Sequence, residues 1–284
     1  MKNKFKTIIC AIFILFLCNI MLFATNDIEP SQIDYFSAGM VLQGHPGNLV
    51  ELLLVSPDGK KIGYDVKKST IVNDYDPVRS SYFLDGYYEL NAGEIFEEWN
   101  NLDFHGKIVN GRYVLNVIGK KTGIYRITMF ITGGNIGGSE INGIISSGDI
   151  HEIYIDFKLP ADKTIIKKAV DFMVLKKEFE HTINEYKNDK ELYRNMIKQF
   201  DILTTKLNEK EVNSFVILLN NAKNIIEKNG IQKPSFPLPR VADKKGREQM
   251  IKWRKYNKWY KKRVVPLDIL IKDAKTILDN MLQK

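Results

Sequence analysis

The stretch "NGRYVLNVIGKKTGIYRITMFITGG", residues 110–134, contains one pattern twice. The first copy consists of Gly111, Tyr113, Leu115 and Val117, and the second of Gly123, Tyr125, Ile127 and Met129. Alternation of apolar and polar residues indicates a strand that buries one face. The segment therefore predicts two strands, 112–118 and 124–132. The loop between them is bounded by glycines and carries Lys120 and Lys121, which is typical of a β-hairpin.

The sequence around this stretch continues in the same style. Residues 49–55 form an apolar run that ends at "SPDG" (56–59), a turn sequence in which proline presets φ and glycine accepts a positive φ. A second turn, "SSGD" (146–149), precedes another alternating run at 151–157. Short strands separated by turns, with no long helical pattern between them, predict an antiparallel β-sandwich of the jelly-roll or immunoglobulin-like kind over residues 25–160.

The doubled motif resembles a β-sandwich module of exported bacterial proteins, the pre-peptidase C-terminal domain and its relatives. The hallmark of that module is G-x-Y-x-L-x-V followed by a second G-x-Y-x-L-x-V, and the resemblance covers about residues 45–158. It implies a sandwich fold and an accessory role, because such modules accompany many unrelated catalytic or adhesive partners. The chain departs from the commonest arrangement in that helical patterns follow the sandwich.

Residues 161–284 have the periodicity of helices. In residues 267–281 the apolar positions recur every three or four residues, as in an amphipathic helix, and Pro266 suits its first turn. Residues 208–229 repeat this design, with Gly230 as a C-cap. Two further helices are predicted at 162–187 and 189–206. The expected fold is thus a two-domain α+β chain, whose small C-terminal helical bundle (161–284) contains a proline-rich inserted loop at about 230–242.

The first 24 residues read as a targeting segment. Three lysines precede an apolar run, the pattern of a secretory signal peptide. The run approaches the roughly 20 residues that span a bilayer, so an uncleaved anchor is the alternative. Either interpretation predicts an exported protein, in the periplasm, outside the cell or on its surface. Both cysteines, Cys10 and Cys18, lie in this segment, which argues against disulfides, cysteine-ligated metals and a cysteine nucleophile in the exported part.

The balance of charge reverses along the chain. Residues 26–160 carry 18 acidic and 11 basic residues, whereas residues 161–284 carry 16 acidic and 28 basic ones. The reversal coincides with the change from strand to helix patterns. It therefore supports a domain boundary near residue 160 and indicates an anionic partner for the second half.

The basic residues are densest at 244–263, where ten lysines and arginines accompany a single acid and are interleaved with four aromatic residues. One interpretation is a helix whose aromatic stripe packs on the bundle while the lysines remain in water. Another is a binding face for an anionic polymer, lipid headgroups or nucleic acid. A third is docking onto the protein's own acidic sandwich. The candidate binding residues are Lys252, Trp253, Arg254, Lys255, Lys258, Trp259, Lys261, Lys262 and Arg263.

No linear motif indicates a catalytic centre. The chain lacks the nucleophile elbow, the H-E-x-x-H helix and the phosphate-binding loop. Its four histidines (His45, His105, His151 and His181) are not spaced as metal ligands. Adjacent Glu97 and Glu98 do not by themselves form the pair of carboxylates that acid–base hydrolysis needs across a cleft.

A calcium site is the one cofactor hypothesis that the sequence offers. Calcium takes six to eight oxygen ligands, and exported sandwiches collect them from loops. The candidate ligands are Asp58, Asp74, Asp76 and Asp85. The alternative is ordinary turn chemistry, for which aspartate needs no ion.

These patterns together predict a non-enzymatic interaction or accessory protein of the bacterial envelope. The sandwich would contact a protein or a glycan, and the basic helices would contact an anionic surface or polymer, with membrane-surface contact as one form of this. The export signal disfavours nucleic acid as the partner. The competing hypothesis is a secreted hydrolase-type enzyme whose active site no linear motif reveals.

Overall fold

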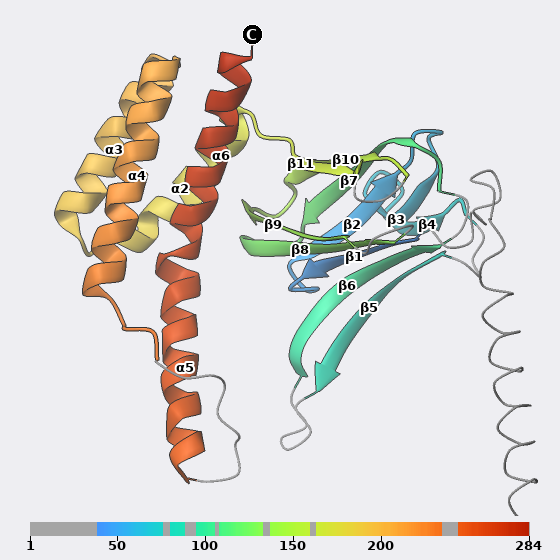
Figure 1. The fold of residues 1–284 in the computed structure, drawn as a ribbon, viewed down its shortest axis with the longest axis horizontal. Coiled ribbons are helices and arrows are strands. Elements are labelled where there is room, and N and C mark those ends of the chain that lie inside the picture. Colours follow the sequence, from blue (N-terminus) through green and yellow to red (C-terminus); the bar gives the residue numbers. More distant parts are fainter. Residues whose placement is uncertain are drawn as a thin grey trace, which may run out of the picture. The chain divides into compact units, whose positions relative to one another are not determined.

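The computed structural model describes residues 39–75, 80–88, 95–105, 108–132, 137–159, 163–234 and 244–283. The predicted signal segment at 1–24 lies outside these residues. The described chain forms two antiparallel sheets followed by helices, an α+β fold (Figure 1). Among these residues, no helix combines the length and the apolar character that crossing a membrane requires.

Each sheet combines strands that are consecutive in sequence with strands that are distant in sequence. The five-stranded sheet has the order β5 (Ser80–Tyr88), β6 (Ile95–His105), β1 (Gly39–His45), β8 (Gly123–Thr132) and β9 (Gly137–Ile145). The six-stranded sheet has the order β11 (Ile165–Lys168), β10 (Ile150–Phe157), β7 (Gly111–Gly119), β2 (Val50–Val55), β3 (Lys61–Asp65) and β4 (Thr70–Asn73). All pairings are antiparallel.

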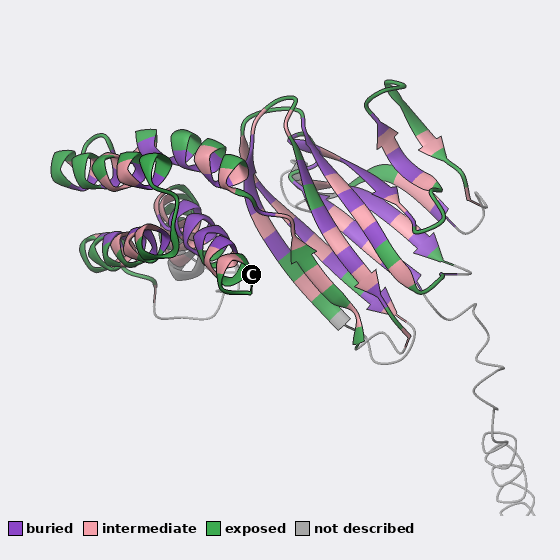
Figure 2. Cartoon of the chain, turned by 90° about the horizontal axis from the view of Figure 1, so that it is seen from above, coloured by how far each residue is buried: buried purple, intermediate pink, exposed green. Residues whose placement is uncertain are grey.

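The two sheets share one hydrophobic core, as the sheets of a β-sandwich do. Leu42 and Ile127 of the five-stranded sheet lie in the same buried cluster as Leu52 and Leu115 of the six-stranded sheet. Figure 2 shows buried and exposed residues alternating along the strands. This alternation is the predicted period of two, because successive side chains of a strand point to opposite faces.

The predicted hairpin at 110–134 is wrong, although both of its strands exist. β7 pairs with β2 and β10, whereas β8 pairs with β1 and β9, so the loop 120–122 connects two different sheets. The amide of Lys120 donates to the carbonyl of Leu49 (2.8 Å) instead of closing a hairpin turn. Tyr113 and Tyr125 therefore both point into the shared core, one from each sheet. Alternation alone predicts a strand but not its partner.

Three of the described helices begin at a short polar side chain that caps them. The bounds of the helices are α2 (Phe172–Ile183), the 3-10 helix η4 (Asn184–Tyr186), α3 (Lys190–Thr205), α4 (Glu209–Asn229), α5 (Lys244–Arg263) and α6 (Val265–Leu282). Asp171, Asp189 and Asn208, which precede α2, α3 and α4, each accept a hydrogen bond from the backbone amide three residues later, which satisfies an amide that the first turn leaves unpaired. Pro266 lies in the first turn of α6, as predicted.

The helices bury a second apolar cluster, in which aromatic rings from three helices meet. Phe179 of α2 stacks on Phe200 of α3 with ring centroids 4.0 Å apart, and Phe215 of α4 lies against both rings. Leu267 and Leu270 of α6 belong to the same cluster. The predicted helices at 189–206, 208–229 and 266–282 correspond to α3, α4 and α6.

The helix predicted over 162–187 is wrong in its first ten residues. Residues 165–168 form β11, which pairs with β10, and the helix begins only at Phe172. In "TIIKKAVDF" the β-branched isoleucines suit a strand, and Asp171 then caps α2. The six-stranded sheet therefore extends past residue 160. Most of the predicted proline-rich loop, at 235–243, lies outside the described residues.

Candidate functional site

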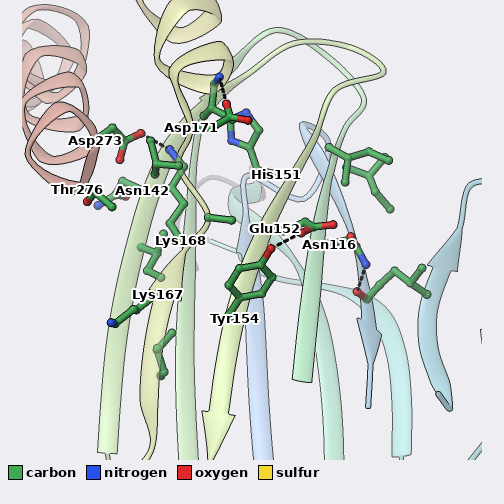
Figure 3. Close-up of a pocket in the computed structure, with 18 of the residues that line it drawn as sticks. Asn116, Asn142, His151, Glu152, Tyr154, Lys167, Lys168, Asp171, Asp273 and Thr276 are labelled. Atoms are coloured by element: carbon green, nitrogen blue, oxygen red, sulfur yellow. Dashed lines mark hydrogen bonds and ion pairs between the residues drawn. The ribbon is translucent and has the colours of Figure 1, made fainter. Parts of the chain in front are cut away.

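A groove of about 1260 Å³ crosses the six-stranded sheet and reaches α6 (Figure 3). Strands β2, β3, β7, β9, β10 and β11, the segment that leads into α2, and α6 all contribute to its walls. Among the described residues, its charged lining consists of five lysines and six carboxylates: Lys61, Lys67, Lys167, Lys168, Lys272, Asp65, Glu140, Glu152, Asp171, Asp273 and Asp279. The groove is therefore polar and close to electrically balanced.

Residues that pair across neighbouring strands form rows along the floor of the groove. Glu152 of β10 lies opposite Asn116 of β7, which lies opposite Leu53 of β2. The neighbouring row runs from Lys167 of β11 through Tyr154 of β10. Directly opposed residues of adjacent strands have Cβ atoms about 5 Å apart, so these side chains form one continuous surface. Figure 3 shows Asn116, Glu152 and Tyr154 on this surface.

Two contacts fix the orientation of Tyr154, one at its hydroxyl group and one at its ring. Its hydroxyl donates to Glu152 Oε2 (2.8 Å), and the guanidinium of Arg112 lies 5.1 Å from its ring centroid. Arg112 in turn makes two hydrogen bonds to Asp156, at 2.7 and 3.0 Å. The ring remains partly accessible to solvent. This chain of contacts orients an aromatic face in the groove.

At the α6 end of the groove, three charged side chains meet in the protein interior. Lys168 Nζ of β11 lies 2.7 Å from Glu178 Oε1 of α2 and 2.5 Å from Asp273 Oδ2 of α6. The side chains of Lys168, Glu178 and Asp273 are 6%, 0% and 3% exposed. The amide of Ile144 in β9 also donates to Glu178 Oε1 (2.9 Å). This buried ion cluster, Lys168–Glu178–Asp273, thus connects α2 and α6 to the edge strands β9 and β11.

Burial sets the protonation of the ion cluster. Burial raises the pKa of Glu178 well above its usual value, against the pull of Lys168, and neighbouring Asp273 adds to the rise. For Lys168, burial alone would lower the pKa, but Glu178, Tyr125 and Asp273 outweigh it and raise the pKa. These directions favour a protonated Glu178 beside a charged Lys168, whose Nζ lies 2.5 Å from Asp273 Oδ2. A lysine held in its charged form cannot act as a base or a nucleophile.

His151 lies next to the ion cluster and is 2% exposed. Its Nδ1 is 3.1 Å from the hydroxyl of Tyr125 and 4.0 Å from Glu178 Oε1. Burial, reinforced by the charge of Lys168, lowers the pKa of His151 to about 4. Its burial and its contact with Tyr125 indicate a structural role for His151.

The buried His151 predicts a pH dependence of stability. The unfolded chain binds a proton near the ordinary pKa of 6.5, whereas the folded chain resists protonation down to about 4. The contribution of His151 to the free energy of unfolding is therefore expected to fall as pH drops from 6.5 toward 4, at up to about 1.4 kcal/mol per pH unit, whereas the raised pKa of Glu178 acts in the opposite direction. Urea denaturation of the wild type and of His151→Gln across this range measures the slope, which the variant should reduce. Equal slopes would contradict the assignment.

Two of the four aromatic residues of α5 pack on the other helices, as the first interpretation of this segment expects, whereas Trp253 lies against Tyr256 with ring centroids 5.9 Å apart. Trp259 and Tyr260 pack against the helical core, and Tyr256 stacks on Tyr260 with centroids 5.6 Å apart. The indole of Trp259 lies so close to Gly230 that a Cβ there would come within 1.9 Å of it. Gly230 is thus the C-cap of α4, as predicted, and also the residue against which Trp259 of α5 packs.

Most cations of α5 lie away from its aromatic side, whereas Lys252 shares the helix face of Tyr256 and Trp259, four and seven positions later. Lys252, Lys255, Lys258, Lys261 and Lys262 are all exposed, as is Arg254. Lys262 pairs with Glu185 of η4 at 3.0 Å. Arg263 differs from the rest: it donates to the carbonyl of Glu185 (2.7 Å) and lies over the ring of Tyr186, so its role is structural. Of the predicted binding residues, the lysines and Arg254 thus remain candidates.

The predicted calcium ligands have other partners nearby. Asp58 contacts the hydroxyl of Ser56 and lies 3.6 Å from Lys60, and the hydroxyl contact, despite some burial, lowers the pKa of Asp58. Asp74 accepts from the amide of Lys61 (3.0 Å), Asp85 lies on β5, and Asp76 is outside the described residues. Across the ranges that the structure describes, no three acidic, histidine or cysteine side chains are grouped as a metal site.

The other acidic and histidine residues considered in the sequence lie as follows in the part of the chain that the structure describes. Glu98 and Glu97 are neighbours on β6. His45 lies near Trp99 with ring centroids 5.5 Å apart, and His181 Nε2 contacts the hydroxyl of Ser146.

Sequence reasoning missed the ion cluster and the groove. A signal for the cluster was present, because Glu178 and Asp273 interrupt the apolar stripes of their helices beside Phe179 and Ala274. A charged residue on an apolar face indicates a buried partner. The groove left no such signal, since Leu53, Asn116 and Glu152 become neighbours only through strand pairing.

Comparisons with known proteins identify no relative of this chain: no family model, no curated protein and no solved structure matches it.

Proposed function

We propose that this chain is an exported, non-enzymatic interaction protein of the bacterial envelope. Its helix α5 would bind an anionic surface, and its β-sandwich would contact a protein or a glycan. The observation that carries the proposal is the arrangement of α5, in which Trp259 and Tyr260 pack on the other helices while the lysines are exposed to solvent. Residues 1–24 support export.

The spacing of the cations supports a binding face on α5. Residues 255, 258 and 262 are three and four positions apart, so their side chains share one face of the helix. Ile251, 53% exposed, lies on the same face. A row of lysines with an exposed apolar residue can combine attraction to anionic groups with shallow apolar contact.

The position of the aromatic residues favours an extended anionic surface over single-stranded nucleic acid. Nucleic acid of that kind needs accessible rings on which bases stack. The rings of Trp259 and Tyr260 are engaged with the helical core. The exposed lysines can attract anionic groups without the help of aromatic rings. Lipid headgroups and anionic envelope polymers need no such rings for binding.

The buried ion cluster supports a non-enzymatic role. Lys168 is committed to two carboxylates, and the depressed pKa of His151 leaves it uncharged at neutral pH. The hydrolase hypothesis needs an acid and a base that face an open cleft in different protonation states. In the ion cluster the Glu178 side chain is 0% exposed, so it does not face an open cleft.

Binding of the wild-type protein to anionic surfaces tests the proposal. Vesicles of phosphatidylglycerol and of phosphatidylcholine, and an immobilised polyanion, are mixed with the chain without residues 1–24 at about 50 mM and about 500 mM salt. We expect sedimentation with the anionic vesicles or capture by the polyanion at low salt, and release at high salt. Equal binding to neutral vesicles, or no binding to either anionic probe, would reject the role of α5.

A further inference from the structure

We propose that the groove over the six-stranded sheet is a binding site for an uncharged oligosaccharide, with Tyr154 at its centre. The inference rests on the proposed function and names the ligand class of the sandwich. It places that ligand on strands β2, β7 and β10, on the outer face of the sheet.

The size of the groove indicates an oligomeric ligand. Its volume of about 1260 Å³ exceeds the roughly 300–1,000 Å³ typical of small-molecule pockets. The lining runs from Leu53 of β2 to Thr276 of α6, and crosses several strands on the way. An elongated ligand can use this length, whereas a single small ring would occupy a fraction of it.

The charge balance of the groove indicates that the ligand is uncharged. Five lysines face six carboxylates in the lining, and several of them already pair with one another. Lys61 bonds to Asp65 at 3.1 Å, and Lys168 bonds to Asp273. A polyanion or polycation would meet charges of its own sign along the groove.

The polar groups at the floor suit the hydroxyl groups of sugars. A sugar hydroxyl both donates and accepts, so it pairs well with side chains that offer either role. The side-chain amide of Asn116 contains both a donor and an acceptor group. The carboxylate of Glu152, which lies opposite Asn116 on β10, provides acceptors. Asn142 and Thr276 line the same groove. Carboxylate acceptors make stronger hydrogen bonds than neutral ones, which compensates for displaced water.

Tyr154 supplies the apolar contact that a sugar ring also needs. One side of a pyranose ring carries C–H groups, which pack against an aromatic face through dispersion and weak C–H contacts. The ring of Tyr154 is partly exposed, and the contacts with Arg112 and Glu152 fix its orientation. A pre-oriented ring loses little conformational entropy on binding.

The edges of the groove disfavour a peptide that would extend a sheet. Strand addition needs a long edge with unpaired backbone groups. β11 has four residues and carries two lysines, a composition that protects edges against pairing. On β9 the amide of Ile144 is already bound by Glu178.

The test measures binding of cellotetraose, chitotetraose and maltotetraose, each by titration calorimetry, to the folded chain without residues 1–24. We expect at least one of them to bind the wild type, and Tyr154→Ala and Glu152→Ala each to weaken that binding about tenfold or more. Phe130→Ala is the matched control, because Phe130 is 40% exposed on β8 of the other sheet. Thermal melting verifies that the three variants fold.

Each result bears on the inference separately from the function of α5. Failure of all three sugars to bind would overturn the groove proposal, as would unchanged affinity in both groove variants. Vesicle binding is measured on the same samples. Retained vesicle binding without sugar binding would reject only the groove proposal, whereas loss of both would reject the proposed function too.

Discussion

Replacing Lys168 with methionine is expected to lower the free energy of unfolding by about 3–5 kcal/mol. The change removes the one cation between Glu178 and Asp273 and leaves two carboxyl groups in a site from which water is excluded. Removing one member of a buried ion pair is costly because the remaining charge has neither solvent nor partner. Urea denaturation followed by circular dichroism measures the difference.

Two further variants separate the ion pair from the general effect of losing a lysine. Lys167→Met changes the neighbouring residue, which is exposed, and is expected to alter stability by less than about 0.5 kcal/mol. The triple variant Lys168→Met, Glu178→Gln and Asp273→Asn removes the charges together and should regain part of the loss, because no carboxylate is then left unpaired. A Lys168→Met protein as stable as the wild type would contradict the assignment.

The ion cluster also connects the helices to the sheets across the predicted boundary near residue 160. Its three members come from β11, α2 and α6, and Glu178 reaches a fourth element through the amide of Ile144. The predicted boundary near residue 160 follows charge and periodicity. Charge and periodicity are local properties, so neither predicts the contact between residues 168 and 273, which are about a hundred positions apart.

The sequence predicted elements well where a local rule decides them. The apolar periods of 208–229 and 266–282, and the caps Gly230 and Pro266, correspond to observed helices. Alternation identified β7 and β8, but whether a short loop joins neighbours in one sheet or crosses between two depends on the whole core. The loop after β7 crosses between the sheets, and in it the amide of Lys120 donates to the carbonyl of Leu49.

The two candidate sites, the α5 face and the groove, also differ in how far the sequence predicts them. The faces of α5 follow from helical spacing, so the sequence predicted the exposed lysines, although it left open which way Trp253 and Trp259 would face. The groove depends on strand order. Glu152 and Asn116 are opposite one another only because β10 pairs with β7, and no pattern within either strand records that pairing.

Replacing Lys255, Lys258, Lys261 and Lys262 together with glutamine is expected to weaken binding to phosphatidylglycerol vesicles about a thousandfold. Each lysine near an anionic membrane contributes about 1 kcal/mol, and the four are exposed on one helix. Glutamine preserves length and helix propensity, and Arg263 is left in place because it supports η4. Sedimentation over a range of vesicle concentrations measures the affinity, and the decline of affinity with salt should become shallower.

Four lysines outside α5 provide the matched control: Lys190, Lys198, Lys206 and Lys210 are exposed as well, and their replacement by glutamine changes the net charge by the same amount. If the arrangement on α5 matters, this control should retain most of its affinity, because screening limits each charge to a range of about 10 Å. Equal losses in the two variants would show that only net charge attracts the protein to the surface. The face of α5 would then have no specific role, since a diffuse field does not depend on which helix carries the lysines.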